Sequence, residues 1–301
     1  SEMCIRDRHM TPPEHATDGP RLTFEIAASP LHPAEEVAEI VRPIGELLSH
    51  LGGREQSAVA DAPHCYVVAT GGTEQGLLDR IDARHSVVPN EPALLVAHAA
   101  HNSLPAALET LARLHQDGRR GRIVLADTED ASAVDEAVAD IDAYNRFQRT
   151  RIGLVGDPSP WLVASTPSAE SVRERWGPTL VPIDIGSVVE RSRATPVTLG
   201  RRVADRFDAR PSASLPPPES VVAAAQLHPV LQQVAEEHEV DSITVRCFDL
   251  LEPLHTSGCV ALAQFNDDGF VAGCEGDVPS TLALLWARHL LGQAGWIANP
   301  A

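Results

Sequence analysis

The sequence predicts an α/β protein made of two domains, each with a parallel β-sheet covered by helices on both faces. Short apolar runs alternate with amphipathic helical patterns through the first half of the 301-residue chain, which is the order expected of β–α–β units. A second series of buried strand patterns begins at Ile152, and a chain of this length has room for two domains. We therefore expect two Rossmann-like domains, over residues 21–150 and 151–301, after a non-native or disordered leader over residues 1–20.

The expected first domain contains four strands, at residues 21–28, 65–70, 93–99 and 122–126. Apolar residues at helical spacing predict a helix over residues 37–51, in which Pro43 predicts a kink. A second helical pattern starts at Ser103, a favourable N-cap residue, and ends near Gly118. A third, around Val134–Tyr144, has acidic residues at its start and arginines at its end, as the helix dipole favours.

The expected second domain contains five strands, at residues 152–156, 179–185, 242–247, 260–265 and 270–274. Leucines at helical spacing after Val278 predict a further helix. The stretch Arg210–Pro218 holds four prolines in nine residues, so we expect an exposed loop there.

The composition excludes several classes of protein. Lysine and arginine total 24 against 42 aspartates and glutamates, a net charge of −18, and every one of the cations is an arginine. Without lysine there is no Schiff-base enzyme and no Walker-type NTPase. The acidic balance argues against nucleic acid and anionic membranes as partners, and no apolar run is long enough to cross a bilayer. A small polar molecule such as a sugar, or a metal ion, fits this balance better.

The five cysteines are Cys4, Cys65, Cys247, Cys259 and Cys274. Their number is odd and their spacing matches neither a zinc site nor a small disulfide-rich domain. We expect a reduced, cytoplasmic protein.

The most informative stretch is Cys274–Glu275–Gly276–Asp277, which follows an expected strand and precedes an expected helix. Ligands of open α/β sheets bind beyond the carboxyl ends of the strands, so Glu275 stands where a catalytic carboxylate is expected. Glu275 and Asp277 are two residues apart across a glycine, a spacing that lets both point into one cavity and bind a hard divalent cation. In the alternative, Asp277 caps the following helix and Glu275 is a solvated loop residue.

Several segments together resemble the central domain of the L-fucose isomerase and L-arabinose isomerase superfamily, in particular its fucose-isomerase-like members. In the second half these segments are Asp241–Phe248, Ser257–Ala263, Asn266–Gly269, Cys274–Asp277 and Gly295–Pro300. Gly71–Glu74 and Asn102–Glu109 resemble segments of the same group, so the resemblance extends over residues 22–301.

This resemblance implies a manganese-dependent aldose–ketose isomerase, an intramolecular oxidoreductase that works through an ene-diolate. It assigns Glu275 to metal binding and acid/base catalysis, with Asp277 beside it. Asn299 stands near a position where some relatives carry an aspartate ligand, and is the second candidate metal ligand. The remaining ligands are expected in a third, C-terminal domain missing from this sequence, which would make the chain an inactive fragment. A homo-oligomer with a sugar substrate is also implied.

Other candidates have two interpretations each. Gly71–Gly72 after a strand could cradle a phosphate or form a tight turn. His98 and His101 could be metal ligands or partly buried, hydrogen-bonded histidines. Cys65 and Cys247 could form the thiol pair of a cofactor-free racemase or be inert in the core. Alternative functions are therefore a non-catalytic sugar-binding or regulatory protein and a two-cysteine racemase.

Overall fold

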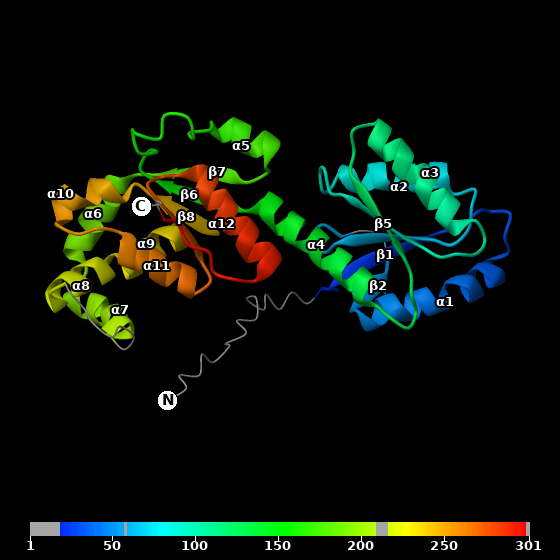
Figure 1. Ribbon diagram of the computed structural model, residues 1–301, viewed down its shortest axis with the longest axis horizontal. Coiled ribbons are helices and arrows are strands. Elements are labelled where there is room, and N and C mark those ends of the chain that lie inside the picture. Colours follow the sequence, from blue (N-terminus) through cyan, green and yellow to red (C-terminus); the bar gives the residue numbers. More distant parts are fainter. Residues whose placement is uncertain (1–18, 57–58, 209–215, 299–301) are drawn as a thin grey trace. The chain divides into compact units, whose positions relative to one another are not determined.

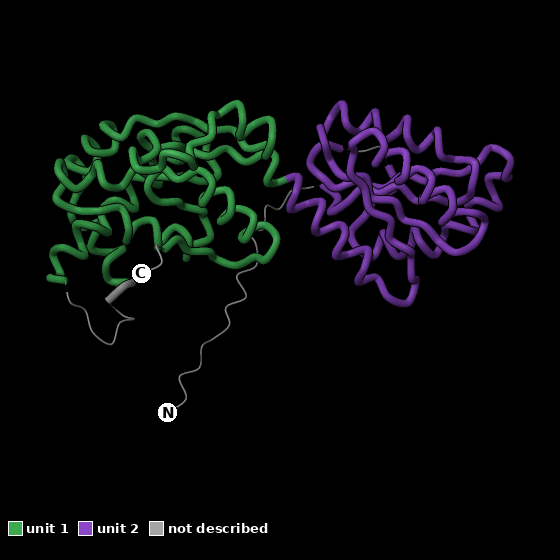
Figure 2. The backbone as a smooth tube through the Cα atoms, turned by 45° about the horizontal axis from the view of Figure 1, so that its top comes forward, with its two compact units in different colours: residues 1–14, 146–301 green, residues 15–145 purple. Residues whose placement is uncertain are grey.

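The computed structural model describes residues 19–56, 59–208 and 216–298. They form two compact units, one holding the described residues up to Asn145 and the other those from Arg146 onward (Figure 2). The expected domain boundary, between residues 150 and 151, lies a few residues further along. The expected leader lies outside the described residues, apart from its last two positions.

The first unit is built on a five-stranded sheet in which every neighbouring pair of strands is parallel (Figure 1). The strand order is β2-β1-β3-β4-β5. The strands are β1 (Leu22–Ala27), β2 (Gly53–Glu55), β3 (His64–Val68), β4 (Ala93–Ala97) and β5 (Gly121–Leu125). The four expected strands are confirmed, and β2 is an additional short strand at the sheet edge.

Four helices cover both faces of this sheet: α1 (Ala34–His50), α2 (Glu74–His85), α3 (Ser103–Gln116) and α4 (Ser132–Arg149). Alternate side chains of a strand point to opposite faces. Cys65 and Val67 of β3 therefore pack with α1 and α4, while Tyr66 and Val68 pack with α2 and α3. This two-sided burial explains why the central strands read as continuous apolar runs.

The start of α3 differs from the expectation in one detail. Asn102, with φ of +56°, is the N-cap, and Ser103 is the first helical residue. The buried Ser103 hydroxyl instead donates to the Val68 carbonyl and accepts the His98 backbone amide. Ser103 therefore connects the ends of two neighbouring strands, which is a different role from the expected cap.

The second unit has a four-stranded parallel sheet in the order β7-β6-β8-β9. Its strands are β6 (Arg151–Val155), β7 (Thr179–Ile183), β8 (Ser242–Val245) and β9 (Val271–Cys274). Its helices are α5 (Ala169–Arg175), α6 (Ile185–Ala194), α7 (Val197–Asp208), α8 (Pro218–Ala225), α9 (Leu227–Glu237), the 3-10 turn η1 (Cys247–Leu250), α10 (Leu251–Leu254), α11 (Cys259–Asp267) and α12 (Val278–Leu291). Helices α6, α9 and α11 pack on one face of the sheet, and α5 and α12 on the other.

The strand expected at residues 260–265 is wrong, because these residues belong to helix α11. Its buried side chains are Ala261, Leu262, Gln264 and Phe265, a spacing that matches one face of a helix. A short apolar run is compatible with a buried helix or a buried strand, so the run alone does not distinguish the two. Of the loop expected at residues 210–218, positions 210–215 lie outside the described residues, and α8 begins at its last proline.

The strand order gives each sheet a switch point, and in open α/β sheets ligands bind at the carboxyl edge beside such a point. In both units the second strand pairs with one side of the first strand, and the third strand pairs with its other side. The loops that follow the first and third strands therefore turn away from each other at the carboxyl edge of the sheet. In the second unit Val155, Val245 and Cys274 are paired in register at the ends of β6, β8 and β9. The loops after these three strands therefore start side by side.

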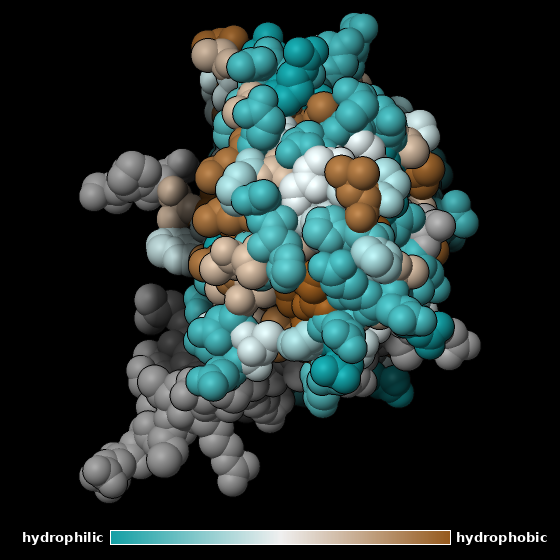
Figure 3. Space-filling view, turned by 90° about the vertical axis from the view of Figure 1, so that its right-hand side faces the viewer, coloured by the Kyte–Doolittle hydropathy of each residue, from teal (hydrophilic) through white to brown (hydrophobic). Residues whose placement is uncertain are grey.

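The surface agrees with the acidic, polar composition. The face of the first unit seen in Figure 3 is mostly hydrophilic, with hydrophobic residues separated by polar ones. Among the helices that the structure describes, none combines the length and the apolar character needed to span a bilayer.

Candidate functional site

The loop after β9 carries Glu275 and is bonded to the loops after the two neighbouring strands. The Glu275 carbonyl accepts the Ser159 amide at 2.9 Å, and the Gly276 amide donates to the Val245 carbonyl at 3.2 Å. These bonds connect three strand ends that are far apart in the sequence. Glu275 is thereby held at the carboxyl edge of the sheet, as the sequence predicts.

The backbone at this loop is in an uncommon conformation. Glu275 has φ of +63° and Gly276 has φ of +68°, two consecutive residues in the left-handed region. A non-glycine residue there costs roughly 1–2 kcal/mol, and such outliers concentrate at functional sites. A Cβ on Gly276 would stand 2.8 Å from Pro158 Cα and 2.9 Å from the Asp157 carbonyl oxygen, so this close approach requires glycine.

The Glu275 carboxylate lies against an aromatic pair. Its Oε2 accepts a hydrogen bond of 2.7 Å from Trp161 Nε1. The Trp161 ring meets Phe248 edge to face, with 5.1 Å between ring centroids, and both rings are about half exposed, at 51% and 48%. A carboxylate beside two accessible aromatic rings suits a small ligand with both polar groups and apolar faces.

Asp277 points elsewhere. Its Oδ1 accepts the Ser280 backbone amide at 2.9 Å and its Oδ2 accepts the Ser280 hydroxyl at 2.7 Å, so it is the N-cap of α12. Both oxygens are therefore engaged at the start of the helix, and the expected convergence of Glu275 and Asp277 in one cavity is not observed. The catalytic role of Asp277 stays a prediction without geometric support.

The described residues do not make up a manganese site. Among them, no three histidine, cysteine, aspartate or glutamate side chains are arranged to hold a metal ion. Glu275 contributes one carboxylate with an oxygen already bound to Trp161, whereas hard cations such as manganese require several oxygen ligands. Asn299, the second expected ligand, lies outside the described residues. The dependence on manganese stays a prediction.

Three thiols lie at the same edge of the sheet, and the sequence patterns did not single them out as a group. Cys247 follows β8, Cys274 ends β9, and their Sγ atoms are 2.9 Å apart. Cys259 begins α11 and lies within interaction range of both. The bonds from Cys247, Cys274 and Ser257 hold the pKa of Cys259 well below its usual range, while the pKa values of Cys247 and Cys274 are raised. Their proximity could have been predicted from their positions in the chain, since two of these residues lie at the carboxyl ends of neighbouring strands.

In the first unit, the segment Gly71–Gly72 forms a tight turn. The Gly71 amide donates to the His101 carbonyl, and the Gly72 amide donates to the Glu74 side chain. Neither amide is therefore free to cradle a phosphate.

His98 is fixed by two bonds, to the Ala69 carbonyl and from the Ala100 amide, and is partly buried. This agrees with the hydrogen-bonded interpretation. His101 is exposed and its ring lies 6.1 Å from that of His98, without forming a metal-ligand set in the described part of the chain.

The structure argues against a two-cysteine racemase, because one of the two proposed thiols is inaccessible. Cys65 lies in the core of the five-stranded sheet with none of its surface exposed, and burial raises its pKa. A residue in this position cannot reach a substrate. Cys247 belongs to the other unit.

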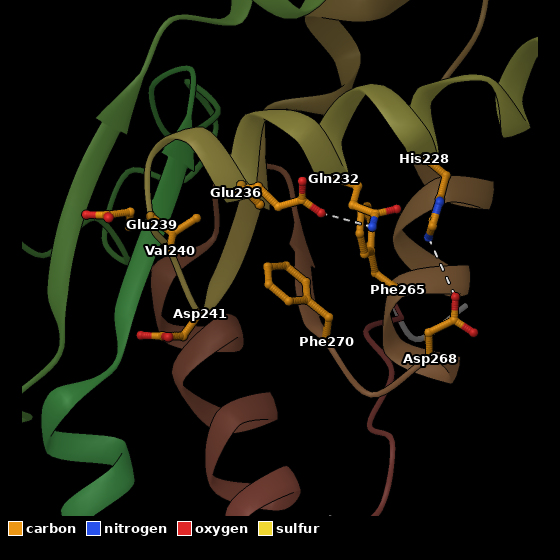
Figure 4. Close-up of a pocket in the computed structure, with 10 residues that line it drawn as sticks. His228, Gln232, Glu236, Glu239, Val240, Asp241, Phe265, Asp268 and Phe270 are labelled. Carbon is orange, nitrogen blue, oxygen red and sulfur yellow. Dashed lines mark hydrogen bonds and ion pairs between the residues drawn. The ribbon is translucent and has the colours of Figure 1, made fainter. Parts of the chain in front are cut away.

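A cleft of about 450 Å³ lies in the second unit beside the amino-terminal ends of β8 and β9, away from Glu275 (Figure 4). His228, only 8% exposed, stacks on Phe265 and has its Nε2 3.7 Å from Asp268. Burial lowers the pKa of His228, against the opposing effect of Asp268. Further acidic side chains around the cleft are Glu236, Glu239 and Asp241. This acidic surround disfavours anionic ligands, and the sequence had given no indication of the cleft.

Comparisons with known proteins give a distant relationship to sugar isomerases. No protein-family model matches the sequence. The chain is similar to the sulfoquinovose isomerases of Priestia aryabhattai and Priestia megaterium, at 26% identity over 143 residues in each case. The match covers 47% of this chain and 32% of each relative, so it extends over about a third of the length of these relatives.

Proposed function

We propose that this sequence belongs to a sugar isomerase that interconverts an aldose and the corresponding ketose, with Glu275 as the acid/base residue. The distant similarity to two sulfoquinovose isomerases supports the reaction class. The observation that carries the assignment of the residue is the hydrogen bond from Trp161 to Glu275, which holds a carboxylate at the carboxyl edge of the sheet.

The reaction moves hydrogen between two adjacent carbons, so it requires a base that takes a proton from one carbon and returns it to the other. Trp161 bonds Oε2 of Glu275, which leaves Oε1 for the substrate. The carboxylate would take the proton at C2 of the aldose, giving an ene-diol(ate), and the resulting carboxylic acid would return it at C1. The proton of the C2 hydroxyl would pass to O1, so that C2 becomes the carbonyl carbon of the ketose. The rings of Trp161 and Phe248 would pack against the apolar faces of the sugar and orient it.

A divalent cation, manganese by the sequence resemblance, is part of this proposal although the described residues do not provide its site. Its ligands would have to include groups besides Glu275. The identity of the sugar is a separate question, for which L-fucose, L-arabinose and sulfoquinovose are the first compounds to test. A homo-oligomeric, cytoplasmic enzyme is the expected form.

The test is an isomerisation assay on the complete gene product, with and without Glu275→Gln. Loss of an acid/base group costs about 100-fold or more in rate. Glu236→Gln is the matched control, because Glu236 is an exposed carboxylate beside the cleft at the opposite edge of the sheet. Chelation followed by addition of manganese tests the cation. Unchanged turnover by Glu275→Gln would refute the role of this residue.

A non-catalytic sugar-binding protein is the second candidate. It is favoured by Asp277, whose two oxygens are both committed to the start of α12. This candidate predicts that calorimetry detects sugar binding that EDTA does not change, without formation of the isomeric sugar.

A further inference from the structure

Three thiols, Cys247, Cys259 and Cys274, form what we call the thiol cluster. Strands β8 and β9 are paired so that Val245 lies opposite Cys274, which places Cys247 just beyond the end of the neighbouring strand. Helix α11 precedes β9 and begins with Cys259. The parallel sheet and the connection between its strands thus bring together three cysteines that are 12 to 27 residues apart in sequence.

The contacts within the thiol cluster are close. Cys247 Sγ and Cys274 Sγ are 2.9 Å apart, and the Cys259 thiol lies within interaction range of both. A disulfide bond is about 2.05 Å long, so an approach of roughly 1 Å would join the first pair. Thiolates on one tetrahedral zinc ion stand ~3.8 Å apart, given Zn–S bonds of about 2.3 Å. The separation of Cys247 and Cys274 therefore suits a disulfide better than shared metal ligation.

The three thiols differ in accessibility. Cys259 is exposed, Cys274 is partly buried, and Cys247 is buried with 3% of its surface exposed. Cys259 is the first residue of a nine-residue helix and lies within interaction range of both other thiols and of Ser257. A helix N-terminus and several donors favour a thiolate, the reactive form of cysteine. A reagent from solution therefore meets Cys259 first.

We propose that the thiol cluster is a hydroperoxide-reactive site that closes a disulfide between Cys247 and Cys274 by way of Cys259. The Cys259 thiolate attacks the peroxide, breaks its O–O bond and becomes a sulfenic acid, with release of an alcohol or water. The Cys274 thiol attacks this sulfur, forms a Cys259–Cys274 disulfide and releases water. Cys247 then attacks the sulfur of Cys274, which forms the final disulfide and returns the Cys259 thiol. In sum, two thiols and one hydroperoxide give one disulfide, one alcohol and one water.

The bridge would form directly beside Glu275. Cys274 is its neighbour in the chain, and the Glu275 backbone lies near the Cys247 thiol. The disulfide would join the ends of β8 and β9 at the loop that holds this carboxylate. The thiol chemistry itself does not depend on the proposed isomerase activity.

The test is to treat the chain with hydrogen peroxide in a Cys4→Ser background and to map its disulfides by mass spectrometry without reduction. We expect a Cys247–Cys274 bridge, while Cys65 stays reduced because it is fully buried. Dimedone added with the peroxide should label Cys259, the residue expected to form the sulfenic acid. Absence of any bridge within the thiol cluster, or labelling of Cys65 in place of Cys259, would overturn the proposal.

Two variants test the order of the steps. Cys259→Ser should slow bridge formation about tenfold or more while giving the same final bridge, because the exposed thiol is lost. Cys247→Ser should stop the sequence at a Cys259–Cys274 bridge. If Cys259→Ser forms the bridge at the wild-type rate, Cys259 is not the reactive thiol and the proposed route is wrong.

Discussion

The indole of Trp161 donates a hydrogen bond of 2.7 Å to the carboxylate of Glu275, 114 residues further along the chain. The bond fixes one carboxylate oxygen and the direction in which the other points. Trp161 therefore acts on the proposed reaction through the orientation of Glu275, and its ring also forms part of the surface expected to contact the sugar.

Replacing Trp161 by phenylalanine should lower the isomerisation rate of the complete protein by about tenfold or more. The variant keeps an aromatic ring but removes the donor, and a hydrogen bond to a charged group is worth about 1.5–3 kcal/mol. The measurement is kcat and KM for the sugar that the wild type converts. Trp176→Phe is the control, because Trp176 has a similar exposure, 47% against 51%. Equal kcat values for the two variants would contradict the positioning role.

Replacing Gly276 by alanine should destabilise the second unit by about 2 kcal/mol or more. The residue would enter the left-handed region and its Cβ would meet backbone atoms of Pro158 and Asp157 at less than 3 Å. All four tryptophans lie in this unit, so chemical unfolding followed by tryptophan fluorescence reports on it.

Gly292→Ala is the matched control for this change. Gly292 has nearly the same φ, +64°, but open space around the position of its Cβ. The Gly292→Ala change should lower the free energy of unfolding only by the cost of holding alanine in a left-handed backbone conformation, about 1 kcal/mol. Equal losses in the two variants would show that the packing against Pro158 does not matter.

The fold was predictable where burial leaves a clear pattern. The strands β3 and β4 are buried along their whole length and were found from their apolar runs. The strand β2 was missed because its residues, Gly53–Glu55, are polar and lie at a sheet edge. The helix α11 was mistaken for a strand because its apolar run is too short to show a period.

The site was predictable only as far as strand ends determine it. The position of Glu275 follows from the rule that ligands bind beyond the carboxyl ends of strands. The N-cap role of Asp277 was one of two interpretations of the sequence, and the structure confirms it: the left-handed turn at Gly276 sends this side chain to the start of α12. Trp161 lies in a segment without periodic pattern, and only tertiary structure brings it to Glu275.

Acid should destabilise the first unit through His64. This histidine is buried, bonds to Thr23 at 2.7 Å, and has its pKa lowered to about 3, mainly by desolvation and further by Arg84. The pKa of His64 is near 6.5 in the unfolded state, so the folded state binds the proton less well than the unfolded state. The neutral, buried His64 therefore makes its full contribution to the free energy of unfolding above about pH 6.5. This contribution is lost at about 1.4 kcal/mol for each pH unit between there and pH 3.

The measurement is the free energy of unfolding between pH 7 and pH 4 for the wild type and His64→Gln. The variant should show a shallower fall, since the carboxylates contribute equally to both proteins. His115→Gln, a change at an exposed histidine, should follow the wild type. Parallel curves for wild type and His64→Gln would show that His64 does not titrate with unfolding.

Replacing Arg84 by methionine should destabilise the first unit by about 3–5 kcal/mol, because it leaves the carboxylate of Glu91 buried without its cation. The two side chains are 2% and 3% exposed, and Arg84 also donates to the carbonyls of Val59 and Ala62. The control is Arg113→Met, which breaks an exposed pair with Asp117 and should cost at most about 0.5 kcal/mol. Amide hydrogen exchange in α2 and β4 measures both variants in the same unit. A loss below 1 kcal/mol for Arg84→Met would mean that Glu91 takes up a proton or reaches solvent once Arg84 is removed.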